Sequence, residues 1–219
     1  MKLAIIIPAF NEAKRIGAVL ESLSKFKYQV FVIDDGSSDK TLETAQKYNC
    51  KVLHHKVNLG KGAALKTGCE AAFEAGFEGV IMMDSDGQHS LDDLPKLAEK
   101  LSEGQVDIVF GSRNMSFGTP LVRFLGNKTE SVLISVLFGI YVSDLICGYR
   151  AFTKSAYKKI IWESRGYDVE AEMVIRTGIA KLKYCEVPIQ TIYYDKFKGM
   201  TISDGLFTLL NIIKWRITK

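Results

Sequence analysis

The sequence predicts an α/β fold built on a mostly parallel sheet. Three observations lead to this class: short apolar runs alternate with amphipathic segments of helix length, polar clusters follow the apolar runs, and the composition is that of an ordinary globular chain. The 219 residues are 47% hydrophobic and 25% charged. This length favours one domain, and this composition excludes disordered, collagen-like and disulfide-stabilised small proteins.

The first half of the chain has the clearer alternation. Residues 3–7 form a continuous β-branched run, as expected for a strand buried on both faces. Asn11 is expected to cap the helix that follows, whose apolar residues recur at i, i+3, i+4 and i+7. Further strands are predicted at 30–33, 51–54, 79–83 and 106–111, with helices from Ser38 to about 48 and at 60–75 and 91–101. This order predicts right-handed crossovers between parallel strands.

After Arg113 the alternation becomes irregular. Residues 114–126 read as a loop, and helices are predicted at 128–141, 168–180 and 204–216. Residues 149–152 favour a short antiparallel strand, followed by strands at 183–187 and 190–194. We find no repeat and no linker, so residues 1–219 are expected to form a single domain with an irregular rear half.

Charge and cysteine content narrow the function classes. There are 29 Lys and Arg against 25 Asp and Glu, a net charge of +4. This excess argues against a nucleic-acid binder and allows local basic patches for phosphates or anionic lipid. The four cysteines form no C-x-x-C pair, which indicates thiols in a reducing compartment. The longest uncharged stretch, 131–143, is shorter than the roughly 20 residues of a spanning helix, and no targeting segment is visible, so a cytoplasmic protein is expected.

Polar clusters follow the predicted strands where ligands of parallel sheets bind. Residues 8–12, 34–39 and 84–89 are acidic, whereas 111–113 is basic. This set suits an anionic ligand bridged by a metal ion. Asp84 and Asp86 alternate and therefore point the same way, and Gln88 adds an amide oxygen, so the three predict a Mg²⁺ or Mn²⁺ site. The alternative is an acidic turn that caps a helix, but the neighbouring acidic strand ends favour the metal.

Other nucleotide-binding motifs are excluded. The segment 58–62, Asn-Leu-Gly-Lys-Gly, opens a helix but lacks the Ser or Thr of a P-loop. A dinucleotide-binding fold would have the glycine-rich G-x-G-x-x-G motif after the first strand, but residues 8–12 are Pro-Ala-Phe-Asn-Glu there, which excludes this class. His89 is interpreted as structural, and His54 and His55 are assigned no role.

Five segments in order resemble family-2 glycosyltransferases of the GT-A fold: 5–12 (IIIPAFNE), 32–39 (VIDDGSSD), 58–62 (NLGKG), 83–89 (MDSDGQH) and 111–113 (GSR). Residues 144–152 and 167–174 extend the resemblance weakly. Within the family the chain is most similar to dolichyl- or polyprenyl-phosphate mannosyltransferases and other hexosyltransferases without transmembrane helices. The resemblance implies a Rossmann-like, mostly parallel sheet flanked by helices, with a nucleotide-sugar half at 1–113 and an acceptor half at 114–219.

The resemblance also implies the reaction and its residues. A hexose, with mannose favoured over glucose, would pass with inversion and metal dependence from a donor of the GDP-mannose or UDP-glucose type to a polyprenyl or dolichyl phosphate. Asp86, Arg113 and Arg123 would form the catalytic set, with Arg113 on the donor phosphates and Arg123 on the acceptor phosphate. The nucleotide sugar would contact Pro8, Phe10, Glu12, Ile33, Asp35, Asp84, Gln88 and Lys196.

Two rival functions stay open at this point. Asp168, Glu170 and Glu172 start a predicted helix, and Asp168 or Glu172 would be the base if the acceptor were a saccharide hydroxyl. A phosphate acceptor needs no base, and acids also favour helix N-termini for electrostatic reasons. The second rival is a non-catalytic nucleotide-sugar-binding module that acts through a membrane-protein partner.

The last helix is expected to rest on the cytoplasmic face of a membrane. Lys214, Arg216 and Lys219 lie at its basic end, and Trp215 is of the interfacial type. Residues 132–140 offer a second apolar surface. The apolar stripe of the last helix comprises Leu206, Phe207, Leu209, Leu210, Ile213 and Ile217. The alternative is that this stripe packs on the domain core.

Overall fold

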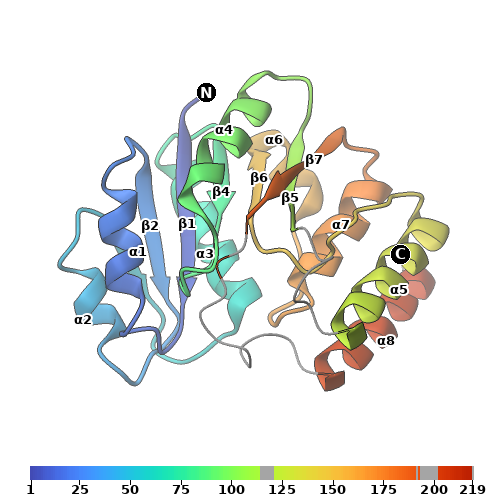
Figure 1. Cartoon of the computed structure of the whole chain (residues 1–219), viewed down its shortest axis with the longest axis horizontal. Coiled ribbons are helices and arrows are strands. Elements are labelled where there is room, and N and C mark those ends of the chain that lie inside the picture. The colour runs from blue at the N-terminus through green and yellow to red at the C-terminus, as the bar shows by residue number, and fades with distance from the viewer. Residues whose placement is uncertain (114–120, 191, 193–201, 219) are drawn as a thin grey trace.

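The computed structural model describes residues 1–113, 121–190, 192 and 202–218, of which 121–123, 202–207 and 218 by their backbone only. A seven-stranded sheet in the order β3-β2-β1-β4-β6-β5-β7 forms the centre (Figure 1). Every paired strand is parallel to its neighbours except β6, which is antiparallel to both β4 and β5 and confirms the antiparallel prediction at 149–152. The strands are β1 Leu3–Ala9, β2 Gln29–Asp34, β3 Lys51–His54, β4 Gly79–Met82, β5 Ile108–Arg113, β6 Arg150–Thr153 and β7 Tyr184–Ile189.

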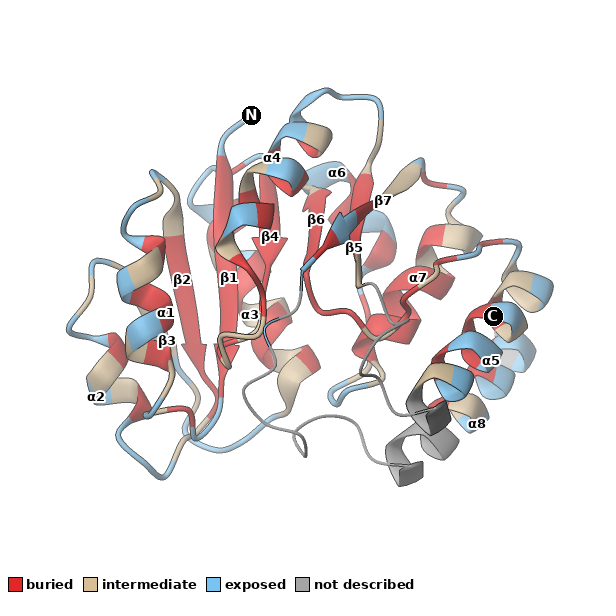
Figure 2. Cartoon of the chain, in the orientation of Figure 1, coloured by how far each residue is buried: buried red, intermediate tan, exposed pale blue. Residues whose placement is uncertain are grey.

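Helices cover both faces of the sheet because successive residues of each buried strand point in opposite directions. Ala4 and Ile6 pack toward α3, α6 and α7, whereas Ile5 and Ile7 pack toward α1 and α4. Figure 2 shows the central strands almost entirely buried between these layers, whereas the edge strands β3 and β7 are only partly buried. The helices are α1 Ile16–Leu23, α2 Thr41–Ala45, α3 Lys61–Glu74, α4 Leu94–Ser102 after the 3-10 turn η1 Leu91–Asp93, α5 Leu121–Phe138, α6 Lys154–Ile160, α7 Val169–Ile179 and α8 Ile202–Thr218.

Several predicted boundaries are wrong for local reasons. Asn11 does not cap α1: its backbone has φ of 54°, and its Oδ1 accepts a hydrogen bond from the Ser38 amide at 2.9 Å. Helix α2 begins at Thr41 rather than Ser38, with Asp39 accepting from the Thr41 amide. Helix α5 begins seven residues before the predicted start, and α6 was not predicted. The predicted strand at 190–194 falls mostly outside the described residues.

Helices α5 and α8 lie side by side at one end of the molecule, next to α7 (Figure 1). Ile134 of α5 and both Ile212 and Trp215 of α8 are buried in the main core. Trp215 is only 9% exposed, so the prediction that it is an interfacial anchor is wrong. Its ring packs in the main core, where burial of a large aromatic side chain stabilises the fold.

Candidate active site

The carboxyl ends of β1, β2, β4 and β5 lead into the predicted polar clusters, as parallel packing requires. The segment after β4 holds Asp84 and Asp86. Asp86 Oδ1 accepts a hydrogen bond from the Gln88 amide at 3.0 Å, and Gly87 has φ of 77°, so the acidic segment forms a tight turn. This turn carries both carboxylates and the Gln88 side chain out of the same strand.

Lys61, at the start of α3, is the closest cation to Asp84 among the described ion pairs. Its ammonium lies 2.6 Å from Asp84 Oδ1 and 2.7 Å from Glu170 Oε1 of α7. Burial opposes ionisation of Asp84, but Lys61, and more weakly His89 and Arg113, overcome it and lower the pKa of Asp84 to about 2. Asp84 is therefore ionised at neutral pH, as a metal ligand must be.

The two glycines that flank Lys61 allow the chain to approach the 162–166 loop closely. A Cβ atom on Gly60 would lie 2.3 Å from the Arg165 carbonyl oxygen, and one on Gly62 would lie 2.1 Å from the Ser164 carbonyl oxygen. The Gly62 amide donates to the Arg165 carbonyl at 2.7 Å. The Gly-Lys-Gly sequence is thus explained by packing: it places Lys61 between β4 and α7.

Arg113, at the end of β5, is held by a carboxylate that sequence reasoning missed. Asp144 accepts from Arg113 Nε at 2.6 Å and from Arg113 Nη2 at 2.8 Å, a two-point contact on a buried acid. The same acid accepts from the Arg113 amide at 3.1 Å. The sequence signal that could have pointed to Asp144 is its place in the segment 144–152, which weakly extends the family resemblance. The pair fixes the direction of the guanidinium at the sheet edge.

His89 and Gly148 complete the surroundings of Asp84. The Asp84 amide donates to His89 Nδ1 at 3.2 Å, which leaves the proton of the neutral ring on Nε2. The His89 ring stacks on Tyr149, with centroids 4.7 Å apart, and is buried, which agrees with its structural interpretation. A Cβ atom on Gly148 would lie 2.8 Å from Asp84 Oδ2, so only glycine leaves room for this carboxylate.

The side-chain oxygens after β4 can hold a divalent cation only if a further ligand completes its coordination. Asp84, Asp86 and Gln88 supply oxygen atoms, the donors that Mg²⁺ and Mn²⁺ prefer. No group of three or more His, Cys, Asp and Glu side chains able to hold a metal is found among the described residues. Two carboxylates and an amide leave coordination positions for diphosphate oxygens, so the residues fit a cation that binds together with a nucleotide.

The residues predicted to hold base and ribose occupy different depths. Phe10 is exposed at the end of β1, whereas Pro8 is buried and Ile33 is 0% exposed, so these two present no side-chain surface to a ligand. Glu12 is buried and lies 3.4 Å from Arg15 Nη1. Asp35 accepts from the Leu59 and Gly60 amides at 3.0 and 2.8 Å, so its carboxylate orders the segment that leads to Lys61.

The two histidines that the sequence left without a role are partners of the acids at the end of β2. His55 Nδ1 lies 2.7 Å from Asp35 Oδ1, and His54 Nδ1 lies 2.7 Å from Asp34 Oδ2. Both contacts form because β3 pairs in parallel with β2 and its end faces the end of that strand. The acids at the end of β2 are therefore already hydrogen-bonded within the fold.

The rear acids have structural partners. Glu172 is buried and accepts from the Glu163 amide at 3.0 Å, the Ser164 amide at 2.8 Å and Arg176 Nε at 2.6 Å. Burial raises the pKa of Glu172, but these donors outweigh it and hold the pKa below its usual range. Asp168 accepts from Ser164 Oγ at 3.0 Å. The structure thus ties both candidate bases to the 162–166 loop.

Two predicted residues cannot be placed. Lys196, with its neighbour Lys198, lies outside the described residues. Arg123 lies in the first turn of α5, but its side chain is outside the described part of the chain.

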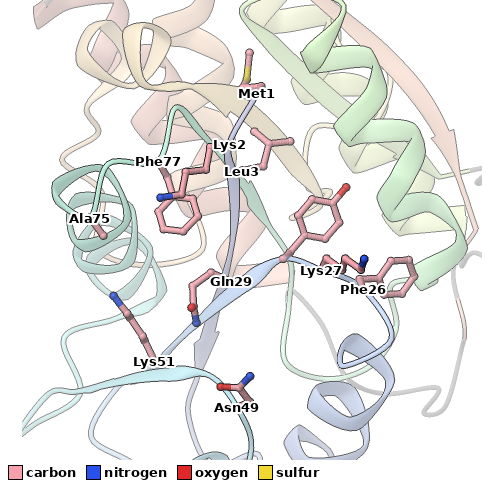
Figure 3. Close-up of a pocket in the computed structure, with 11 residues that line it drawn as sticks. Met1, Lys2, Leu3, Phe26, Lys27, Gln29, Asn49, Lys51, Ala75 and Phe77 are labelled. Atoms are coloured by element: carbon pink, nitrogen blue, oxygen red, sulfur yellow. The ribbon is translucent and has the colours of Figure 1, made fainter.

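A cavity of about 670 Å³ lies at the opposite edge of the sheet (Figure 3). It is lined by residues at or before the starts of the first three strands, among them Leu3, Gln29 and Lys51. Because ligands of parallel α/β sheets bind at the carboxyl ends of the strands, this cavity is not the candidate active site.

The order and direction of the strands, with helices on both faces of the sheet, define an α/β protein of the GT-A class. A solved structure agrees: glucosyl-3-phosphoglycerate synthase from Mycobacterium tuberculosis, in complex with Mn²⁺, UDP and glucosyl-3-phosphoglycerate, has a TM-score of 0.71 at 19% identity. The match covers 96% of this chain and 79% of that one. At this identity the likeness concerns the fold.

Sequence comparison identifies the family. Residues 4–161 match Glycosyl transferase family 2, and the chain belongs to that family. It is 32% identical over 241 residues to a UDP-N-acetylglucosamine–dolichyl-phosphate N-acetylglucosaminyltransferase of Methanococcus voltae, covering 98% of this chain and 96% of the relative. It is 28% identical over 233 residues to an undecaprenyl-phosphate mannosyltransferase of Micrococcus luteus, covering 98% and 94%. The predicted fold, family and enzyme class are thereby confirmed.

Proposed function

We propose that this glycosyltransferase moves a hexose or N-acetylhexosamine from a nucleotide diphosphate sugar to a polyprenyl or dolichyl phosphate. The observation that carries the proposal is that two carboxylates after β4 and a fixed arginine at the end of β5 lie at one edge of the sheet. The full-length relatives whose names state a polyprenyl-type lipid phosphate acceptor support the acceptor class. Mannose remains the favoured sugar, and the N-acetylglucosamine of the Methanococcus voltae relative widens the range to test.

The chemistry follows from where charge develops. As the bond between the anomeric carbon and the diphosphate breaks, negative charge grows on the leaving oxygen. A divalent cation held by Asp84, Asp86 and Gln88 would neutralise that charge. The contact with Asp144 directs the Arg113 guanidinium, whose remaining N–H groups would bind phosphate oxygens. Attack by the acceptor phosphate from the opposite side of the sugar would invert the anomeric centre.

A phosphate acceptor needs no general base, and this agrees with the use of the rear acids in the fold. Glu172 is buried and accepts hydrogen bonds from two amides and from Arg176, so both of its carboxylate oxygens are engaged within the fold. Asp168 is held by Ser164 Oγ and Asn211 Nδ2 at 3.0 and 3.1 Å. Transfer to a saccharide hydroxyl would require Glu172 to give up these contacts or Asp168 to act through Oδ1, because the two hydrogen bonds of Asp168 end on Oδ2. This makes it the less favoured function.

We further propose that α5 and α8 rest together on the membrane that holds the acceptor. No described helix is both long enough and apolar enough to span a bilayer. Val136 of α5 is 77% exposed, and Leu210 and Ile217 of α8 are 66% and 80% exposed. Lys128 of α5 and both Lys214 and Arg216 of α8 are exposed as well. Apolar side chains flanked by cations suit an interface with anionic headgroups.

The reaction is tested with purified protein, Mn²⁺ and a phosphorylated polyprenol in detergent. Radiolabelled GDP-mannose, UDP-glucose and UDP-N-acetylglucosamine are supplied one at a time, and label is followed into organic solvent. The proposal expects label in the lipid phase with one donor and none with the dephosphorylated alcohol. Transfer to a saccharide acceptor, with no lipid product from any donor, would contradict it.

A further inference from the structure

Lys61 has no role in the reaction as proposed, although it contacts a proposed metal ligand. Its ammonium bridges Asp84 Oδ1 and Glu170 Oε1. With a carboxylate on either side of it, the Lys61 ammonium keeps its positive charge. Apart from Lys61, the buried Glu170 carboxylate has no partner among the residues that the structure describes.

A divalent cation bound to Asp84 would lie close to the Lys61 ammonium, which contacts the same carboxylate. Both positive groups need the same carboxylate, and like charges a few ångströms apart repel strongly where water is largely excluded. Lys61 cancels one of the negative charges that the carboxylates around this position would offer to a cation. A nucleotide diphosphate adds two or more negative charges, which can neutralise the divalent cation and the ammonium together.

We propose that Lys61 is a positioning residue that opposes binding of a divalent cation alone and so makes cation binding depend on the nucleotide diphosphate. This inference rests on the proposed metal site at Asp84 and Asp86. Glu170 offers the Lys61 ammonium a second carboxylate. When Asp84 binds the cation, Lys61 therefore keeps a buried partner and stays in the site.

Packing and hydrogen bonds hold the backbone around Lys61, so the proposed shift of its ammonium requires rotation of the Lys61 side chain only. Gly60 and Gly62 pack against the 162–166 loop, and Asp35 holds the Gly60 amide. On the other side, Arg150 donates to the Glu170 carbonyl oxygen at 2.7 Å and anchors the first turn of α7. A lysine side chain has four rotatable bonds, enough to shift its ammonium between two carboxylates without moving either helix.

The test is Mn²⁺ binding, measured from the electron paramagnetic resonance signal of the free ion, with and without UDP or GDP. Wild type is expected to bind Mn²⁺ at least about tenfold more tightly with the matching nucleotide than without it. Lys61→Met is expected to bind Mn²⁺ alone at least about tenfold more tightly than wild type, because the repulsion is gone. The coupling between Mn²⁺ and nucleotide should shrink by a similar factor.

Two further variants keep the test decisive. Lys66→Met removes the same charge from a partly exposed position on α3, five residues on, and should leave Mn²⁺ binding unchanged. Lys61→Met leaves Glu170 buried without a partner, so Lys61→Met/Glu170→Gln serves if the single variant does not fold, as judged by circular dichroism.

Mn²⁺ affinity in both Lys61 variants equal to or weaker than in wild type would overturn the inference. If wild type binds no Mn²⁺ even with both nucleotides, the proposed metal site fails and the role of Lys61 fails with it. If the coupling appears as expected but no lipid is glycosylated, the role of Lys61 stands and the proposed acceptor is wrong.

Discussion

At the scale of single residues, the charged groups of the candidate site are paired with partners distant in the sequence. Asp84 is paired with Lys61, Arg113 with Asp144, and Asp35 with His55. An unpaired buried charge costs several kcal/mol, so pairing is what allows ionised groups to sit at this sheet edge. Each pair also fixes the direction of a side chain before any substrate arrives.

The first prediction concerns the two acids after β4. Asp84→Ala and Asp86→Ala should each abolish transfer to lipid, because neither variant retains both carboxylates of the proposed cation site. Asp84→Ala should still fold, since Lys61 keeps Glu170 as a partner. Turnover is measured with the radiolabel assay and folding by circular dichroism. Full activity of either variant, or of wild type in excess chelator, would contradict the metal assignment.

The second prediction separates phosphate contact from base catalysis. Arg113→Ala should lose more activity than Asp168→Asn, which should lose less than the roughly 10²–10⁴-fold that a general base contributes. Glu172→Gln should instead lower stability by about 1–3 kcal/mol, because an amide cannot accept all the hydrogen bonds of this buried carboxylate. Steady-state rates and urea unfolding measure the two effects. A collapse of Asp168→Asn with tolerant Arg113→Ala would favour a saccharide acceptor.

The third prediction concerns Glu130 of α5, which is 4% exposed. Burial raises its pKa from 4.5 to about 7. The folded state therefore holds the proton more tightly than the unfolded chain, so this group costs stability as pH rises from about 4.5 to 7. Glu130→Gln should be more stable than wild type at pH 8, by up to about 3 kcal/mol, and equal to it near pH 4. Urea unfolding at both pH values measures this, and a difference independent of pH would contradict it.

At the scale of elements, α5 and α8 are amphipathic helices with two apolar faces. One face packs on the domain through Ile134, Ile212 and Trp215. The other leaves Leu125, Val132 and Val136 exposed on α5 and Leu210, Ile213 and Ile217 exposed on α8, spaced at helical intervals. The core-packing interpretation of α8 therefore holds for the inner face, and the membrane interpretation stays a prediction for the outer face.

The fourth prediction tests the outer face. Wild type should float with vesicles that contain anionic lipid and polyprenyl phosphate, and the double variant Leu210→Glu/Ile213→Glu should not. A matched control, Val57→Glu/Ile161→Glu, places the same charges at exposed apolar positions outside α5 and α8 and should still float. Circular dichroism checks folding in both variants. Wild type that never floats would remove the membrane surface from the proposal.

At the scale of the whole molecule, donor binding should be visible as a gain in stability, since a ligand that binds only the folded state stabilises it by mass action. The fifth prediction is that Mn²⁺ with either UDP or GDP, at about a hundredfold over its dissociation constant, raises the melting temperature by roughly 5–10 °C. The nucleotide that does so identifies the donor class. Equal shifts with Mn²⁺ alone and with Mn²⁺ plus nucleotide would contradict cooperative binding.

The sequence by itself determined the class of sheet and the edge where the site lies. Apolar runs such as 3–7 are long and β-branched enough to predict strands without tertiary context, and parallel strands bring their polar ends to one edge. The motifs at 83–89 and 111–113 then indicated the family, which the comparison confirmed. The choice of Asp84, Asp86, Arg113 and Arg123 as catalytic or metal-binding residues stays a prediction.

Only the tertiary structure decided which groups meet. Lys61 with Glu170, Arg113 with Asp144, and the histidines after β3 with the acids of β2 are joined by strand order and helix packing, which leave no periodic signal in the sequence. The tertiary structure also decided which residues are buried. Trp215 and Ile217 lie two residues apart on one helix, yet Trp215 is in the core and Ile217 is 80% exposed. Whether a helical face meets the domain or the solvent depends on which neighbour covers it, and that neighbour is supplied by the fold.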